Sequence, residues 1–267
     1  MSKRLTKEEK DLMVEAYLGG KTQADAGLLV GVTGNSCRRE LKKRNIPSRP
    51  ISDAHRKYQV DDYFFDVVDT EEKAYWLGFI TADGCVCGND LKINLKSDDA
   101  GHLKKFLSDI SSDYPIHIRN DFDKRNAKSY EKCTISIRNK NIISSLGKLG
   151  VVSKKSFDVK PCELVPNKFE SAYWRGVIDG DGSFTRKNKD GQCNVTLYGS
   201  EFICAGFKKW ASSFVKSKAR IRKIKSIFGI EFSGNTIAPE VLRRLYGDAT
   251  VYLDRKYEKA MQILEEK

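Results

Sequence analysis

The chain has 267 residues, 40% of them hydrophobic and 10% aromatic, and this composition excludes an intrinsically disordered protein. Its 48 Lys and Arg residues exceed its 36 Asp and Glu residues, which gives a formal net charge of +12. Because a basic excess that is spread along the chain suits a polyanionic partner, we consider nucleic acid first, with a merely soluble basic protein as the alternative.

The seven cysteines and three histidines are too scattered for a zinc framework, since no two cysteines form a Cys-x-x-Cys pair. Cys85 and Cys87 would point to the same face of a strand, and we predict that they pack in the core. The N-terminus has no signal-peptide pattern, and no apolar run approaches the length of about 18 residues that a membrane span needs. We therefore expect no membrane contact and an intracellular location, in the cytoplasm or nucleoid of a bacterial or phage setting, with an organelle as the alternative.

The first 46 residues are predicted to form a small domain of three short helices. Thr6 is placed to cap the first helix, with Glu9 completing a capping box. The second helix, TQADAGLLV, is closed by Gly31, and the third begins near Thr33. This order is typical of a helix-turn-helix, although a plain three-helix bundle uses the same apolar spacing.

The segment GVTGNSCRREL resembles the turn and recognition helix of the resolvase-like helix-turn-helix group. Small Ala26 and Gly27 suit close helix packing, and Cys37 and Leu41 form the apolar side of the third helix. On this interpretation the polar side of the third helix contacts DNA through Thr33, Asn35, Ser36, Arg38 and Arg39.

A linker is predicted over residues 47–62, followed by an extended segment at 63–68 and by a helix that Thr70 caps. The helix ends in AYWLGFITADG, residues 74–84, and a second stretch, AYWRGVIDGDG, residues 172–182, matches it at 7 of 11 positions. Each stretch opens a run of helix, two strands, helix, two strands and helix, over roughly 70–150 and 169–247. We infer a duplicated αββαββα unit.

The fold class is therefore predicted to be α+β, with two antiparallel sheets. The first repeat spans 63–152, a linker spans 153–168, and the second repeat spans 169–267. In the two motif helices, small residues recur at a spacing of four and form one stripe on each helix. Since such stripes let two backbones approach closely, we predict a helix interface at Gly78, Ala82, Gly176 and Gly180.

Asp83 and Asp181 end the two motif helices, directly before Gly84 and Gly182, which are placed to act as C′ glycines. A carboxylate is unfavourable at the negative end of a helix dipole, and two neighbouring carboxylates repel each other. A divalent cation would resolve both problems, with carbonyl oxygens as further ligands. This chemistry on a basic protein indicates phosphodiester hydrolysis, whereas simple Asp-Gly turn chemistry accounts for only one copy.

The predicted strands alternate apolar residues with polar ones, as half-buried sheets do. Such a face suits phosphates and base edges in a major groove, although any solvated sheet face alternates in this way. The residues predicted to contact DNA from the sheets are Lys92, Asn94, Lys96, Thr134, Ser136, Arg138, Asn194, Thr196, Tyr198, Arg220 and Arg222.

WLGFITADG and WRGVIDGDG resemble the two signature motifs of the LAGLIDADG homing endonucleases, and the αββαββα repeat is similar to the core of that family. The resemblance covers roughly residues 60–262, including YGDATVYLDRKYEKA, which resembles a C-terminal helix of the family. It implies a monomer whose two halves form a saddle over double-stranded DNA. It also implies a metal-dependent double-strand break with short 3′ overhangs at a long, partly asymmetric target.

The resemblance assigns the catalytic metals to Asp83 and Asp181, with carbonyls of Ala82 and Gly180 as extra ligands. The expected metal is Mg²⁺, with Mn²⁺ as a substitute. The sequence departs from the family pattern at the earlier acidic position, which is Asp179 in the second motif but Thr81 in the first. We therefore expect Asp179 to cap the helix or to be solvated, with no essential catalytic role.

The family often has basic residues near the metals. Lys140, with Arg138, is the candidate in the first repeat, and Lys223 or Lys225 is the candidate in the second. Two other functions stay open: a DNA-binding transcriptional regulator that does not cleave, and an RNA maturase that binds intron RNA during splicing. Because both motif aspartates are present, an endodeoxyribonuclease is the favoured interpretation.

Overall fold

The computed structural model describes residues 4–48, 57–123, 128–151, 158–186 and 191–265. The described chain separates into two compact units, Met1–Lys57 and Tyr58–Lys267, each with its own hydrophobic core. The predicted linkers at 47–62 and 153–168 fall partly outside the described residues. No helix within the described ranges is long and apolar enough to cross a membrane.

The first unit contains three helices at the predicted places: α1 (Lys7–Leu18), α2 (Gln23–Leu29) and α3 (Gly34–Lys43). Thr6 and Glu9 form the capping box of α1, since each side chain accepts a hydrogen bond from the backbone of the other. Gly31 has a φ of 72°, a left-handed conformation that glycine adopts readily at the turn before α3. Cys37 and Leu41 are fully buried and attach α3 to the small core.

The second unit consists of two αββαββα repeats, as predicted from the sequence. Single-turn helices η1 (Ser97–Asp99) and η2 (Asn167–Phe169) precede two of the helices, and α11 (Asp254–Glu265) follows the second repeat. The first repeat comprises α5 (Glu71–Asp83), β1 (Gly84–Cys87), β2 (Asp90–Lys96), α6 (Ala100–Asp109), β3 (His117–Asp123), β4 (Lys128–Arg138) and α7 (Lys140–Lys148). The second comprises α8 (Glu170–Asp181), β5 (Gly182–Arg186), β6 (Cys193–Gly199), α9 (Glu201–Ser212), β7 (Arg222–Ile224), β8 (Ile227–Ser233) and α10 (Ile237–Tyr246).

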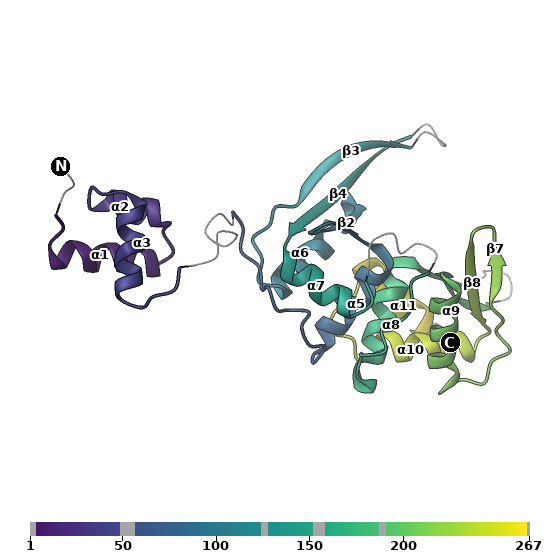
Figure 1. The fold of residues 1–267 in the computed structure, drawn as a ribbon. Coiled ribbons are helices and arrows are strands. Elements are labelled where there is room, and N and C mark those ends of the chain that lie inside the picture. The colour runs from purple at the N-terminus through teal and green to yellow at the C-terminus, as the bar shows by residue number, and fades with distance from the viewer. Residues whose placement is uncertain (1–3, 49–56, 124–127, 152–157, 187–190, 266–267) are drawn as a thin grey trace. The chain divides into compact units, whose positions relative to one another are not determined.

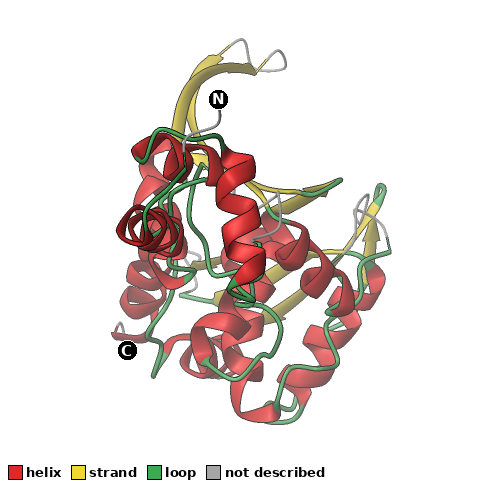
Figure 2. Ribbon diagram, turned by 60° about the vertical axis from the view of Figure 1, so that its left-hand side comes forward, coloured by secondary structure: helices red, strands yellow, loops and turns green. Residues whose placement is uncertain are grey.

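The strands form two antiparallel four-stranded sheets with the same topology, β1-β2-β4-β3 and β5-β6-β8-β7. The motif helices α5 and α8 lie side by side in the middle of this unit, with one sheet on each side of the pair (Figure 1). Only β3 pairs with the first residues of β4, so these two strands extend beyond the rest of their sheet as a ribbon. The ribbon is seen from another side at the top of Figure 2.

Three local predictions were wrong. The segment 63–68 is not extended: residues 62–66 form turns that bury Phe64 and Phe65. Gly84 and Gly182 do not adopt the left-handed conformation of a C′ glycine, since their φ angles are −75° and −94° and each helix passes directly into a strand. Cys85 and Cys87 are exposed because Val86, between them, is the residue of β1 that faces the core.

The motif helices approach each other almost to backbone contact. A Cβ built at Gly78 would overlap the carbonyl oxygen of Tyr173 and lie 2.9 Å from the carbonyl carbon of that residue. A Cβ built at Gly176 would lie 2.6 Å from the amide nitrogen of Phe79. Real Cβ atoms do not come this close to backbone, so the small-residue stripe sets the distance between the helices.

We predict that Gly78→Ala lowers the free energy of unfolding of the second unit by about 1–3 kcal/mol or more, because the added methyl group must push two backbones apart. Gly101→Ala is the control, because a Cβ at Gly101 in α6 meets no atom within 4 Å. The control should leave stability unchanged or raise it by up to about 1 kcal/mol.

Urea unfolding followed by tryptophan fluorescence measures this effect, since all three tryptophans, Trp76, Trp174 and Trp210, belong to the second unit. Equal stability of the two variants would contradict the backbone contact at Gly78.

Candidate active site and nucleic-acid interface

The two motif aspartates stand at the ends of the paired helices. Helix α5 ends at Asp83 and α8 at Asp181, and each helix is followed at once by a strand. A Cβ built at Gly180 would overlap the Cβ of Ala82 and lie 3.4 Å from Oδ2 of Asp83. The helix packing therefore brings the four predicted metal ligands to one place, where Asp83 is half-buried and Asp181 is exposed.

Lys256, on α11, lies against the C-terminal end of α8. Its Nζ donates hydrogen bonds to the carbonyl oxygens of Ile178, Asp179 and Gly182, at 2.6, 2.8 and 2.8 Å. A cation at this position is favourable because the carbonyls at a helix end carry partial negative charge. Burial lowers the pKa of Lys256 to about 8, and the neighbouring carboxylate of Asp179 offsets part of this effect.

Asp179 is neither a helix cap nor solvated, so that prediction was wrong. Its carboxylate is 1% exposed and accepts hydrogen bonds from the hydroxyls of Tyr75, at 2.7 Å, and Tyr246, at 2.6 Å. The backbone N–H of Leu253 donates a third bond at 2.8 Å. Burial raises the pKa of Asp179, whereas the nearby Lys256 ammonium lowers it. The residue joins α5, α8, α10 and the segment that leads into α11.

Arg175 fastens the same C-terminal segment one helical turn earlier in α8. Its guanidinium is buried and donates to the carbonyl oxygens of Leu245, at 2.7 Å, and Val251, at 2.8 Å, and it pairs with Glu71 of α5. A charged Arg and a charged Asp within one apolar helix are visible in the sequence and could have indicated buried polar contacts. Lys256 stood in no motif, so the sequence alone could not have assigned it to this site.

The oxygen ligands at the helix ends fit a hard divalent cation better than a softer metal. Among the described residues, no group of three or more His, Cys, Asp and Glu side chains could hold a metal. Mg²⁺ nevertheless suits two carboxylates, because it commonly keeps several waters and takes further oxygen ligands from substrate phosphates. The carbonyls bound by Lys256 do not include that of Gly180, which was predicted as a ligand.

The strand register places specific side chains level with the two aspartates. In the first sheet, Gly84 pairs with Ile93 and Ile93 with Ile135, so the position of Asp83 is level with Asn94 and Thr134. The hydroxyl of Thr134 donates to the Asn94 side chain at 2.7 Å across the exposed face.

The second sheet has a matching row. Gly182 pairs with Leu197, so Asp181 is level with Tyr198, which faces Gly229 and then Arg222 on the edge strand. The rows level with the two aspartates therefore carry different side chains in the two sheets.

Most of the polar residues predicted on the sheets lie on the exposed faces. Asn194 is an exception, since it is 7% exposed, and its predicted DNA contact is not supported by this burial. Arg220 is exposed but precedes β7, which begins only at Arg222. The residues that are exposed or half-buried on the sheet faces are Lys92, Asn94, Lys96, Thr134, Ser136, Arg138, Thr196, Tyr198 and Arg222.

The predicted catalytic lysines do not lie beside the aspartates. Arg138 lies four residues, or about 13 Å, along β4 from Thr134, the residue level with Asp83. Lys140, the first residue of α7, lies beyond Arg138. Lys223 stacks over the ring of Phe228, on the side of β7 opposite Arg222. The alternative, Lys225, is exposed in the β7–β8 turn with a φ of 56°.

In the first unit, the polar residues predicted on the third helix lie at the start and along one side of α3. Thr33 precedes α3 as its N-cap residue, and Ser36 is half-buried. The exposed members of the set are Thr33, Asn35, Arg38 and Arg39.

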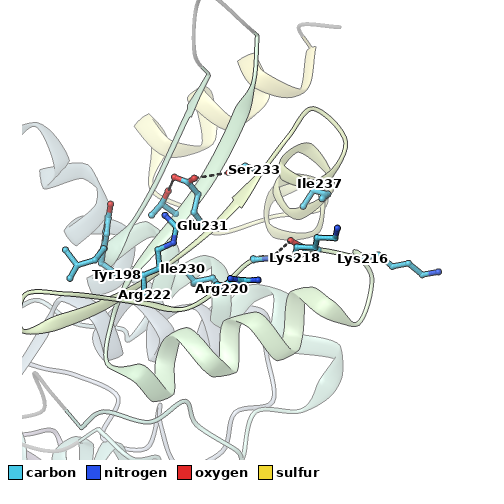
Figure 3. Close-up of a pocket in the computed structure, with 14 residues that line it drawn as sticks. Tyr198, Lys216, Lys218, Arg220, Arg222, Ile230, Glu231, Ser233 and Ile237 are labelled. Atoms are coloured by element: carbon cyan, nitrogen blue, oxygen red, sulfur yellow. Dashed lines mark hydrogen bonds between the residues drawn. The ribbon is translucent and has the colours of Figure 1, made fainter.

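An open groove of about 820 Å³ lies on the exposed face of the second sheet. Figure 3 shows its basic side chains, Lys216, Lys218, Arg220 and Arg222, together with Tyr198 and Glu231. Since Tyr198 and Arg222 also belong to the row level with Asp181, the groove adjoins the candidate metal site.

No protein-family model and no curated protein sequence matches the chain. Solved structures do match it. The meganuclease I-SmaMI, bound to uncleavable DNA, has a TM-score of 0.51 at 10% sequence identity, over 73% of this chain and 90% of that chain. The LAGLIDADG homing endonuclease I-GzeII, in complex with its DNA target, has a TM-score of 0.50 at 12% identity, over 78% and 89%.

Full-length DUF199/WhiA from Thermatoga maritima is also similar, with a TM-score of 0.46 at 18% identity over 78% of this chain, and the match spans only 66% of that chain. At identities of 10% and 12%, the first two matches show the fold alone. The fold is therefore of the LAGLIDADG type, and the predicted α+β class is confirmed.

We predict that Asp179 and Asp181, two residues apart on α8, contribute very unequally to stability. Asp179→Ala should lower the free energy of unfolding by about 3–5 kcal/mol, because it leaves two buried hydroxyls and the backbone N–H of Leu253 without their acceptor and removes the carboxylate charge near the buried Lys256 ammonium. Asp181→Ala should change it by no more than about 1 kcal/mol, because interactions of an exposed carboxylate contribute little to stability. Urea unfolding of both variants measures the difference, and similar losses would contradict the assignment of Asp179 as the buried anchor.

Proposed function

We propose that the chain is a site-specific, divalent-metal-dependent DNA endonuclease that acts as a monomer. The observation that carries the proposal is the position of the Asp83 carboxylate beside Gly180, next to Asp181, at the junction of the two repeats. Each sheet begins directly from one of these aspartates, so DNA bound across both sheets would pass over the carboxylates. One chain supplies both halves of this arrangement, and no second copy is needed to complete it.

Bound Mg²⁺, or Mn²⁺ in its place, would activate a water for attack on the phosphodiester and stabilise the leaving oxygen. Asp83 and Asp181 would hold the metal, with carbonyls of Ala82 and Gly180 available at the same helix ends. The backbone contact between α5 and α8 keeps the two carboxylates in register. Lys256 secures the carbonyls at the end of α8 and thereby holds the backbone that carries Asp181.

The exposed sheet faces would bind the duplex on both sides of the aspartates. Lysine, arginine and hydroxyl side chains suit phosphate oxygens and major-groove base edges. The net charge of +12 favours this partner and predicts that binding weakens as salt rises. The three-helix unit at the N-terminus would add a second region of contact through Asn35, Arg38 and Arg39 of α3.

We predict that Asp83→Asn and Asp181→Asn each reduce double-strand cleavage more than about 100-fold, because loss of a metal ligand removes several kcal/mol of transition-state stabilisation. DNA affinity should stay nearly unchanged, because the phosphate contacts of the sheets are not affected. A cleavage assay with Mg²⁺ on targets selected from a randomised library, combined with a binding assay in the same buffer, measures both.

The matched control for the loss of one negative charge is Glu258→Gln, which removes an exposed carboxylate from α11. This variant should cleave DNA at the normal rate. Undiminished cleavage by either aspartate variant would contradict the metal site. Target-selective binding by the unsubstituted chain, with no cleavage under any divalent metal, would instead favour the non-cleaving regulator.

We predict that deleting residues 1–48 weakens DNA binding and flattens its salt dependence, because fewer phosphates are then neutralised. The remaining chain should stay folded, since the core of the second unit contains no residue of the first. Affinity measured at several salt concentrations tests the first statement, and tryptophan fluorescence of the truncated chain tests the second. Equal affinity, selectivity and salt slope in both chains would show that the three-helix unit does not contact DNA.

A further inference from the structure

A carboxylate stands in the middle of the basic groove on the second sheet. Glu231 lies on β8 and lines the groove together with Lys216, Lys218, Arg220 and Arg222. Its carboxylate nevertheless pairs with none of the described lysines and arginines. It accepts hydrogen bonds from two hydroxyls instead, that of Ser233 at 2.9 Å and that of Thr196 at a longer 3.4 Å (Figure 3).

The position of Glu231 follows from the register. Ser183 on β5 pairs with Thr196 on β6, and Thr196 pairs with Glu231 on β8, so the three form a row across the exposed face. The neighbouring row on the same face is the one level with Asp181. The Glu231 row lies two residues, or about 7 Å, further along the strands from the end of α8. In the proposed arrangement, DNA that lies along the second sheet and reaches Asp181 would pass over Glu231.

A carboxylate in this place is unfavourable for binding phosphates, because like charges about 4 Å apart repel each other even in water. In the major groove the exocyclic amines of cytosine and adenine are the groups that donate hydrogen bonds to an acceptor. Adenine is typically read by an amide that also donates to N7, whereas a Glu or Asp side chain accepts from N4 of cytosine. The two hydroxyls occupy about half of the acceptor sites of the carboxylate and fix its orientation, so acceptor sites remain for a base.

We propose that Glu231 is a specificity-determining residue that selects cytosine at one position of the half-target bound by the second sheet. The inference rests on the proposed function, since it assigns a base contact within the same interface. The basic residues of the groove would hold the phosphates on either side of this base. Glu231 thus trades some affinity for discrimination between base pairs.

The matched position in the first sheet has a different chemistry. The register equates Thr196 with Lys92 and Glu231 with Ser136, which pairs with Lys92 across β2 and β4. Lysine suits the O6 and N7 acceptors of guanine, which a carboxylate would repel. The two halves of the target would therefore differ at this position.

Binding-site selection from a randomised DNA library tests the inference, using the full chain with Asp83→Asn and Asp181→Asn so that bound DNA is not cut. The unsubstituted groove should select cytosine at one position of one half-target, with a preference of about 5- to 150-fold over the other bases. Adding Glu231→Ala should abolish the preference at that position alone, and adding Glu231→Gln should shift it towards adenine. Affinity for unrelated DNA should rise in both variants, because a negative charge is removed from the interface.

Glu258→Gln, which removes an exposed carboxylate from α11, controls for the change in net charge and should leave every position of the selected site unchanged. Identical selected sites for the chains with Glu231 and with Glu231→Ala would overturn the inference while leaving the proposed function intact. If Glu231→Ala instead abolished a preference for adenine, guanine or thymine, the assignment of cytosine would be overturned. Failure of the parent chain to select any sequence would overturn the proposed function together with the inference.

Discussion

The contact between the backbones of α5 and α8 is the constraint on which the rest of the second unit depends. Glycine inside a helix costs about 0.5–1 kcal/mol relative to alanine, yet Gly78 and Gly176 both occupy the interface. Any side chain there would push the helices apart, and the distance between Asp83 and Gly180 at the helix ends would grow with it. The stability cost of the glycines is therefore coupled to the geometry of the candidate metal site.

The two repeats are not equivalent, because the two motif helices hold the C-terminal segment differently: α8 through two buried charged residues, and α5 through Glu71, which accepts a hydrogen bond from the backbone N–H of Thr250 at 2.9 Å. Arg175 and Asp179 of α8 hold it, whereas the corresponding residues of α5 are Leu77 and Thr81, and the Thr81 hydroxyl donates to the carbonyl of Leu77 within its own helix. Buried charges of this kind add little net stability, since their desolvation cost offsets their attraction. We infer that their effect is to fix which side of the pseudo-symmetric pair the segment occupies.

The sequence was sufficient to predict the repeat, the order of the elements and the meeting of the two motif helices, because hydrophobic period and a duplicated motif are local signals. The sequence was insufficient where tertiary contacts determine which way a side chain faces or which residue it binds. The phase of the short strand β1 follows from the end of α5, so Cys85 and Cys87 were assigned to the wrong face. Lys256 reaches α8 from about 75 residues further along the chain, a pairing that no spacing rule predicts.

The two halves of the chain have diverged at different places, and this pattern constrains the target under the proposed function. The motif helices keep their small residues, because each must fit the other at backbone distance. The exposed faces of the two sheets do not have to fit each other, and matched positions on them carry unlike side chains. Asn94 and Tyr198, level with the two aspartates, are an example. A homodimer would present one face twice and would favour a palindromic site. A single chain with two independent faces is free of that restriction, so an asymmetric target follows from the same duplication that supplies the second aspartate.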